Sequence, residues 1–269
     1  MSRRRKRTKT LGDVIRLIVM LAALAVFLYS GYTLYGFYKE YKKSSDEYDN
    51  LEDDDALQSI SGQEVRTVFE DGEEKTLPVL KNPIDFTQLL SVNSDIVGWL
   101  RIRALDISYP VVQGKDNDYY LHRTFEKTDN FAGCLFVNSY NMGDFTDQNT
   151  IIYGHNMKNG SMFGKLKNFN DPEVFKKSRY FWIFTPDFIY QYRIFSASVV
   201  DKTGLTYQIS FTDDEFDQFI SRAYSNSVVD NQDVTVTKED RIVTLSTCTG
   251  DDSTRFVVMG KLAQIYAAR

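Results

Sequence analysis

The sequence predicts a mostly β protein: an eight-stranded barrel with short peripheral helices, preceded by an N-terminal transmembrane helix. Charged residues are absent from 22 consecutive positions near the N-terminus. From about residue 80, short runs of aromatic and β-branched residues are separated by Gly, Pro, Asn and Asp, which is typical of strands joined by turns. The chain also contains 17 Tyr and 19 Phe, whose flat side chains pack well on pleated sheets.

The first 38 residues are organised as a membrane anchor. A basic segment, residues 1–16, precedes the uncharged run of residues 17–38. At about 1.5 Å per residue, a helix of this length crosses a hydrocarbon core of about 30 Å. The positive-inside rule places the basic segment in the cytoplasm, so we predict a single-pass type II protein of the cell membrane with an extracellular body. A cleaved signal peptide is the competing interpretation, because it shares the basic start and the apolar stretch.

Charge is distributed unevenly along the chain. Residues 1–43 hold ten Lys or Arg and two acidic residues, whereas residues 44–269 hold 22 Lys or Arg and 35 Asp or Glu. Nucleic-acid surfaces need clustered positive charge, so the acidic body excludes nucleic acid as a partner. Residues 39–79 are polar and then acidic, and we predict an extracellular linker or helix there. The domain that carries the chemistry is predicted to span residues 80–269.

The elements of that domain follow from local patterns. Each predicted strand is a short run rich in aromatic and β-branched residues: residues 97–102, 107–114, 133–139, 149–155, 179–187, 188–200, 241–248 and 255–266. Helices are predicted at residues 84–93, 162–169, 172–178 and 213–227. The last opens with three acidic residues, which favour the positive end of a helix dipole. Closing the sheet into a barrel would remove its exposed edges.

Cysteine and histidine are scarce. The chain has two of each, Cys134, Cys248, His122 and His155. A zinc site built from Cys and His needs three or four ligands, some of them closely spaced, and disulfide-framework proteins use far more Cys. We therefore predict no metal site and no cofactor.

Three side chains at predicted strand ends could carry out acyl transfer. Cys248 ends one strand, and a hairpin through the loop TGDDST would return Arg255 to its side. A guanidinium there can favour a thiolate or donate hydrogen bonds to an oxyanion. His155 ends the run NTIIYGH, and its imidazole suits proton transfer to a leaving amine near neutral pH. A thiol, an imidazole and a guanidinium suffice for chemistry through a thioester.

Composition and spacing alone leave other interpretations open. A lone Cys is usually a small buried hydrophobe, His155 could be structural, and Arg255 could be a surface charge. Cys134 lies in the apolar run GCLFV and is predicted to be buried, and His122 is predicted to be structural. One alternative is a cell-wall cysteine peptidase of papain-like type, but those place Cys at a helix N-terminus. Another is a non-enzymatic binding module stapled by a Cys134–Cys248 disulfide.

Several motifs resemble the sortase family. TLSTC at 244–248, followed by Arg255 on the next strand, resembles the sortase active-site signature, and NTIIYGHNM at 149–157 resembles the sortase histidine motif. DIVGWLRI at 95–102, YPVVQGKDNDYYL at 109–121 and the helix at 213–227 are similar to class B members. The resemblance covers roughly residues 80–266. The spacing of seven residues from Cys248 to Arg255 is shorter than in many class B members.

The resemblance implies a sortase-type β-barrel and a two-step transpeptidation without a cofactor. Cys248 would be the nucleophile, His155 the general acid and base, and Arg255 the residue that stabilises the oxyanion or positions the substrate. Three further positions match residues that line the substrate groove of the family: Asn117, Tyr153 and Ser246.

The resemblance also implies the substrates. They would be surface proteins with a C-terminal sorting signal of LPxTG or NPxTN type, cleaved after Thr to form a thioacyl intermediate. The acyl group would pass to an amine, which in Gram-positive bacteria belongs to a cell-wall precursor or, in pilus-building members, to a pilin lysine.

Overall fold

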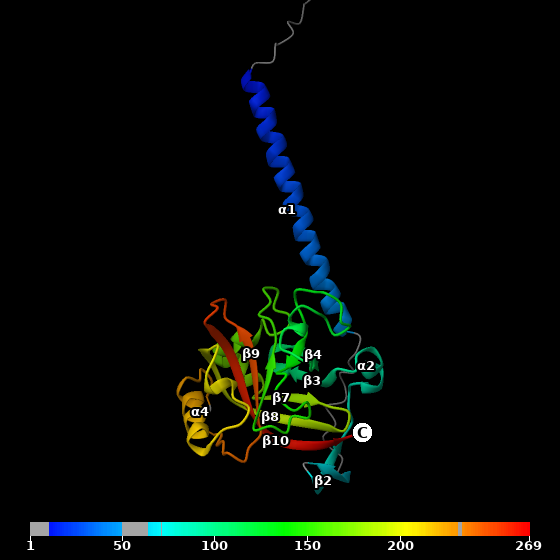
Figure 1. Cartoon of the computed structure of the whole chain (residues 1–269), viewed down its shortest axis with the longest axis vertical. Coiled ribbons are helices and arrows are strands. Elements are labelled where there is room, and N and C mark those ends of the chain that lie inside the picture. The colour runs from blue at the N-terminus through cyan, green and yellow to red at the C-terminus, as the bar shows by residue number, and fades with distance from the viewer. Residues whose placement is uncertain (1–10, 50–63, 71, 231–232) are drawn as a thin grey trace, which may run out of the picture. The chain divides into compact units, whose positions relative to one another are not determined.

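A computed structural model describes residues 11–49, 64–70, 72–230 and 233–269 (Figure 1). The chain divides into an N-terminal unit that ends at Lys43 and a body that begins at Ser44. Much of the predicted basic segment and the most acidic part of the predicted linker, residues 1–10 and 50–63, lie outside the described residues.

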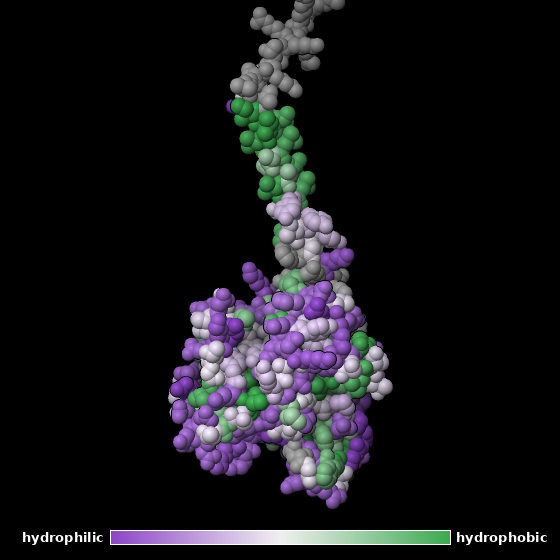
Figure 2. Space-filling model, in the orientation of Figure 1, coloured by the Kyte–Doolittle hydropathy of each residue, from purple (hydrophilic) through white to green (hydrophobic). Residues whose placement is uncertain are grey.

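Helix α1, Leu11–Asp49, forms most of the N-terminal unit. Its stretch Ile15–Gly36 has 22 residues and is apolar enough and long enough to cross a membrane, and none of it is buried. Figure 2 shows hydrophobic residues along this stretch, whereas the visible face of the body is mostly hydrophilic. The prediction of an N-terminal apolar helix is confirmed, with limits two residues earlier than the predicted run of residues 17–38.

Eight strands close into a barrel, as predicted. Their spatial order is β10, β8, β7, β3, β4, β5, β6 and β9, and β9 pairs with β10 to complete the ring. The pairs β4–β5 and β6–β9 are parallel, and the other six are antiparallel. The bounds are β3 Ile96–Ile102, β4 Ile107–Val112, β5 Leu135–Val137, β6 Asn149–Tyr153, β7 Tyr180–Phe184, β8 Phe188–Asp201, β9 Ile242–Cys248 and β10 Thr254–Ala268.

Aromatic residues bring the long strands together. Phe181 of β7 stacks on Tyr192 of β8 with ring centroids 5.2 Å apart, and both side chains are fully buried. Gly260 of β10 lies against this pair, because a Cβ at that position would be 2.4 Å from Phe181 Cε1 and 3.1 Å from Tyr192 Cβ. Contacts that close are forbidden to a methyl group, so a glycine is required where β10 passes the two rings.

Three α-helices cover the described part of the body, and each begins at a capping residue. Asp85 caps α2, Phe86–Val92, and Asp171 caps α3, Pro172–Lys177. α4, Asp213–Ser225, has a capping box formed by Thr212 and Glu215. Its apolar face packs on the barrel in one buried cluster, which joins Phe216, Phe219, Ile220 and Ala223 of the helix to Phe195, Ile242, Val257 and Met259 of the strands.

The predicted linker of residues 39–79 is wrong in its last part. Residues 65–80 form a hairpin of two strands, β1 Val65–Glu70 and β2 Glu73–Leu80. Gly72 has a φ of +78° at the turn, so the Asp-Gly pair at 71–72 is a hairpin signal that outweighs the acidic composition around it. β2 pairs with the last residues of β10, and the sheet therefore begins before residue 80.

Candidate active site

Cys248 and Arg255 face each other across the hairpin of β9 and β10. Their Cα atoms are direct partners in the antiparallel register, so their side chains leave the same face about 5 Å apart at Cβ. The connecting loop is closed by a hydrogen bond of 2.6 Å between the hydroxyls of Thr249 and Thr254. Residues 242–247 of β9 are buried, whereas Cys248 is exposed. The short loop thus returns Arg255 to the thiol, as the sequence predicted.

His155 reaches the same end of the barrel from β6. This strand runs parallel to β9, with Tyr153 opposite Ser246. His155 and Cys248 each follow two residues later, so they lie at the same level. The side-chain amide of Asn156 donates to the carbonyl of Cys248 over 2.8 Å. This hydrogen bond links the residue that follows His155 to Cys248.

A main-chain carbonyl sets the tautomer of His155. Its Nε2 lies 2.8 Å from the carbonyl oxygen of Leu121. A carbonyl can only accept a hydrogen bond, so Nε2 carries the proton and a neutral ring keeps Nδ1 as its basic nitrogen. The imidazole is half-buried, and burial lowers the pKa of His155 below 6.5; the nearby His122 acts in the same direction and the Leu121 carbonyl opposes both. A neutral imidazole is therefore favoured at neutral pH.

The depressed pKa predicts a pH-dependent stability. At pH values between the folded-state pKa of His155 and about 6.5, the unfolded chain binds a proton at this imidazole more readily than the folded chain does. The free energy of unfolding therefore decreases as the pH falls through this range. We expect the urea midpoint of the full-length protein in detergent to fall between about pH 7.5 and about pH 5.5, and to fall less in His155→Gln. His122→Gln is the control and should keep most of the slope, because burial is the larger cause. Equal slopes in wild type and His155→Gln would contradict the depressed pKa.

A cavity of about 450 Å³ joins these side chains. All six residues predicted for the site line it: Cys248, His155, Arg255, Asn117, Tyr153 and Ser246. Other lining residues were not predicted, among them Leu121, Phe136, Lys202, Thr203 and Tyr207. The cavity is open to solvent at Cys248, and its size suits a few residues of an extended peptide.

Tyr207 is the main residue that the sequence analysis missed. Its hydroxyl is hydrogen-bonded to Ser246 Oγ over 2.8 Å, and its ring stacks with that of Tyr153 at a centroid distance of 6.3 Å. Burial raises the pKa of Tyr207 to about 12. The residue lies in the 3-10 turn Leu205–Tyr207, between two predicted elements, where no periodic pattern indicates a contact with the barrel.

Asn117 belongs to a polar network that includes Asn138 and Tyr153. Its side chain accepts from the amide of Ser139 over 2.8 Å and donates to Asn138 Oδ1 over 3.3 Å. Asn138 in turn donates to the hydroxyl of Tyr153 over 3.2 Å. The amide of Asn117 and the phenol of Tyr153 are therefore held by a shared partner, and both can offer hydrogen bonds to a peptide in the cavity.

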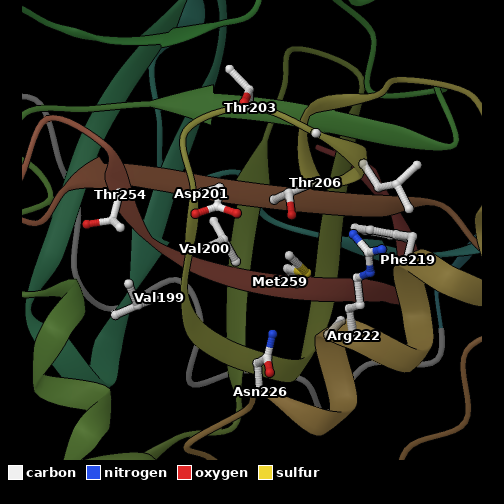
Figure 3. A pocket seen from close by; sticks show the side chains of 13 residues that line it. Val199, Val200, Asp201, Thr203, Thr206, Phe219, Arg222, Asn226, Thr254 and Met259 are labelled. Carbon is white, nitrogen blue, oxygen red and sulfur yellow. The ribbon is translucent and has the colours of Figure 1, made fainter.

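A second cavity, of about 330 Å³, lies between α4 and the ends of β8 and β10. Figure 3 shows Asp201 and Arg222 on opposite sides of it, with Met259 between them. Thr203 and Gly204 line both this cavity and the one at Cys248. These two residues thus form a thin wall between the two cavities.

The two cysteines have different environments. Cys134 is buried, and its thiol donates to the carbonyl of Pro110 over 3.8 Å. Cys248 is exposed, and both described cysteines are reduced. The disulfide of the binding-module alternative is absent from this structure. Cys248 also lies at a strand end rather than at a helix N-terminus, which disfavours the papain-like alternative.

The arrangement suits covalent catalysis on a peptide bond. An exposed thiol can act as a nucleophile, a neutral imidazole lies at the same level, and an arginine is the register partner of the thiol-bearing residue on the next strand. Within the described ranges, no group of three or more His, Cys, Asp or Glu is close enough to hold a metal ion.

Comparison with known proteins gives consistent matches. The model of the sortase domain family matches residues 100–263. A sortase B of Listeria monocytogenes is 33% identical over 266 residues, covering 94% of this chain and 96% of the relative. A Staphylococcus aureus sortase B–substrate complex has a TM-score of 0.62 and 33% identity, covering 66% of this chain and 84% of that chain. Sortase B from B. anthracis has a TM-score of 0.65 and 32% identity, covering 84% and 99%.

Proposed function

Because this chain belongs to the sortase family, and to its class B, we propose that Cys248, His155 and Arg255 together transfer the sorting signals of surface proteins to an amine. Members of this family are cysteine transpeptidases that anchor surface proteins. The observation that supports the assignment most is the position of Arg255 directly opposite Cys248. In addition, Asn156, which follows His155, is hydrogen-bonded to the Cys248 carbonyl.

The first step is attack of the Cys248 sulfur on the carbonyl carbon of the Thr in the signal. The carbon–sulfur bond forms, the oxygen gains negative charge, and Arg255 stabilises it with N–H donors. When the peptide bond breaks, the leaving amine takes a proton from the imidazolium of His155. The products are a thioester and a shortened C-terminal fragment.

The second step reverses the roles of the same groups. The acceptor amine attacks the thioester, His155 removes the extra proton of that amine, and Cys248 leaves as the thiolate and is reprotonated. Attack in the first step requires a thiolate with an imidazolium. Because burial favours neutral His155, this ion pair is a minor fraction at neutral pH, and we expect slow turnover.

The sorting signal is proposed to bind in the cavity of about 450 Å³. Asn117, Tyr153 and Ser246 would contact it, together with Tyr207, which lies beside Tyr153 and Ser246. Motifs of LPxTG or NPxTx type fit this role. The acceptor would be the amine of a cell-wall precursor or of a pilin lysine in a Gram-positive bacterium. The helix at Ile15–Gly36 would anchor the protein in the cell membrane in type II orientation, with the acidic body outside.

Mass spectrometry of the full-length protein in detergent tests the proposal. With an LPxTG or NPxTx peptide we expect a thioester on Cys248 that retains the residues up to Thr. Adding triglycine or a lysine amide should convert it to a conjugate. Cys134→Ala is the matched control and should form the same adduct. Free acid as the only product despite abundant amine would favour the peptidase alternative, and the absence of any adduct with either peptide would contradict the assignment.

A further inference from the structure

Asn149, the first residue of β6, contacts two segments that are distant in the sequence, residues 206–209 and the strand β9 at Thr244. The residue is fully buried. Its Nδ2 donates to the carbonyls of Thr206 over 3.1 Å and of Gln208 over 2.8 Å. Its Oδ1 accepts from the hydroxyl of Thr244 of β9 over 2.8 Å. Both amide hydrogens and the amide oxygen of this buried side chain therefore have partners.

The two carbonyls that Asn149 binds flank Tyr207. The main-chain amide of Asn149 also donates to the carbonyl of Ile209 over 3.2 Å. Residues 206–209 are thus attached to the first residue of β6 at three points. The same strand ends at Tyr153, on which the ring of Tyr207 stacks.

The segment before Tyr207 separates the two cavities. Thr203 and Gly204 line both of them. A Cβ at Gly204 would have no described atom within 4 Å, and the φ of this residue is +107°. Leu205 packs against the buried cluster beneath α4, whereas the carbonyls of Thr206 and Gln208 are held by hydrogen bonds from Asn149. Asn149, the donor in both bonds, is fully buried.

We propose that Asn149 is a positioning residue for substrate binding: by holding the carbonyls on both sides of Tyr207, it sets the wall of the cavity against which the sorting peptide lies. The inference rests on the proposed function, since it assigns the cavity to that peptide. Asn149 does not touch the reacting atoms, so its loss should weaken peptide binding more than the chemical step.

Asn149→Leu distinguishes the hydrogen bonds of Asn149 from its contribution to packing. Leu has a similar size and shape but no donor, so the carbonyls of Thr206 and Gln208 lose their partner. Thr244→Val is the matched control, because it removes a buried hydrogen bond to the same amide while leaving both carbonyl contacts in place. If Asn149→Leu does not fold, Gly204→Ala moves the wall from its other end, because Ala is strained at a φ of +107°.

The first readout requires no activity. Tyrosine labelled with 13C at Cζ reports each phenol, and Tyr207→Phe assigns the signal. In wild type the pKa of Tyr207 is raised to about 12 by burial. In Asn149→Leu we expect it to fall toward the ordinary value of about 10, whereas in Thr244→Val it should stay raised.

The second readout is kinetic. We expect Asn149→Leu to raise the KM for the sorting peptide on the order of tenfold with kcat changed less than about threefold, and Thr244→Val to leave KM within about twofold. In a Tyr207→Ala background, Asn149→Leu should add less than about a twofold change, because both act on one wall.

Several outcomes would overturn the inference. These are an unchanged Tyr207 pKa in a folded Asn149→Leu, equal KM changes in Asn149→Leu and Thr244→Val, or additive effects in the Tyr207→Ala background. If wild type shows no cleavage, the proposed function fails, yet the tyrosine titration still decides whether Asn149 holds this wall.

Discussion

Cys248→Ala is expected to abolish thioester formation and to lower peptide transfer on the order of 10⁴-fold or more, because no other thiol among the described residues lines the cavity. The only other cysteine is buried at Cys134, and its thiol already donates to Pro110. Ala fills less space than Cys at an exposed strand end, so the fold and the cavity should persist. The measurement is the mass of the protein after incubation with peptide, together with the rate of conjugate release.

Two controls make the result specific. Cys134→Ala should transfer peptide at close to the wild-type rate. Cys248→Ala should still bind the sorting peptide with an affinity near that of wild type, as measured by calorimetry, because the lining residues are unchanged. Residual cleavage by Cys248→Ala at more than a trace level would show that the nucleophile lies elsewhere.

Arg255→Ala is expected to lower kcat/KM by about 10²- to 10³-fold, the range typical of a lost oxyanion donor. Two main-chain carbonyls orient the guanidinium: its Nη1 donates to the carbonyl of Thr254 over 2.7 Å and to that of Asp252 over 3.3 Å. Its remaining donors are available to a substrate. Its charge acts across the cavity, where it lowers the pKa values of Tyr153 and Tyr207 against the larger effect of burial.

The conservative variant distinguishes charge from geometry. Arg255→Lys keeps the positive charge but not the planar fork of donors, so we expect its kcat/KM to lie between those of Arg255→Ala and wild type. Lys202 also lines the cavity, and Lys202→Ala is the control for a general loss of positive charge. If Lys202→Ala and Arg255→Ala lose the same activity, the effect is long-range electrostatics rather than a contact with the oxyanion.

The eight barrel strands could be predicted because each is specified locally. The runs at residues 179–187 and 188–200, for example, are so rich in aromatic and β-branched residues that no helix competes, and they appear as β7 and β8. The hairpin that returns Arg255 to Cys248 was equally predictable, since a loop of a few polar residues between two strands leaves little choice. The strands β1 and β2 were not predicted, because the many acidic residues of the stretch 39–79 are typical of a linker and mask the Asp-Gly turn signal.

The walls of the site could not be predicted in the same way. Tyr207 and Leu121 lie in segments without periodic pattern, and they reach the cavity through bonds to residues far along the chain. Asn149 looks like an ordinary strand residue in NTIIYGH, and nothing nearby indicates that its amide binds residues 206 and 208.

The sequence by itself determined the strands, the apolar N-terminal helix and the three reactive side chains at strand ends, because alternation, apolar length and turn residues act over a few neighbouring positions. The tertiary structure alone decided which loops line the cavity beside Cys248 and which carbonyl orients His155. Those contacts require the parallel pairing of β6 with β9, which brings together segments about ninety residues apart. No short stretch of sequence includes both partners of such a contact.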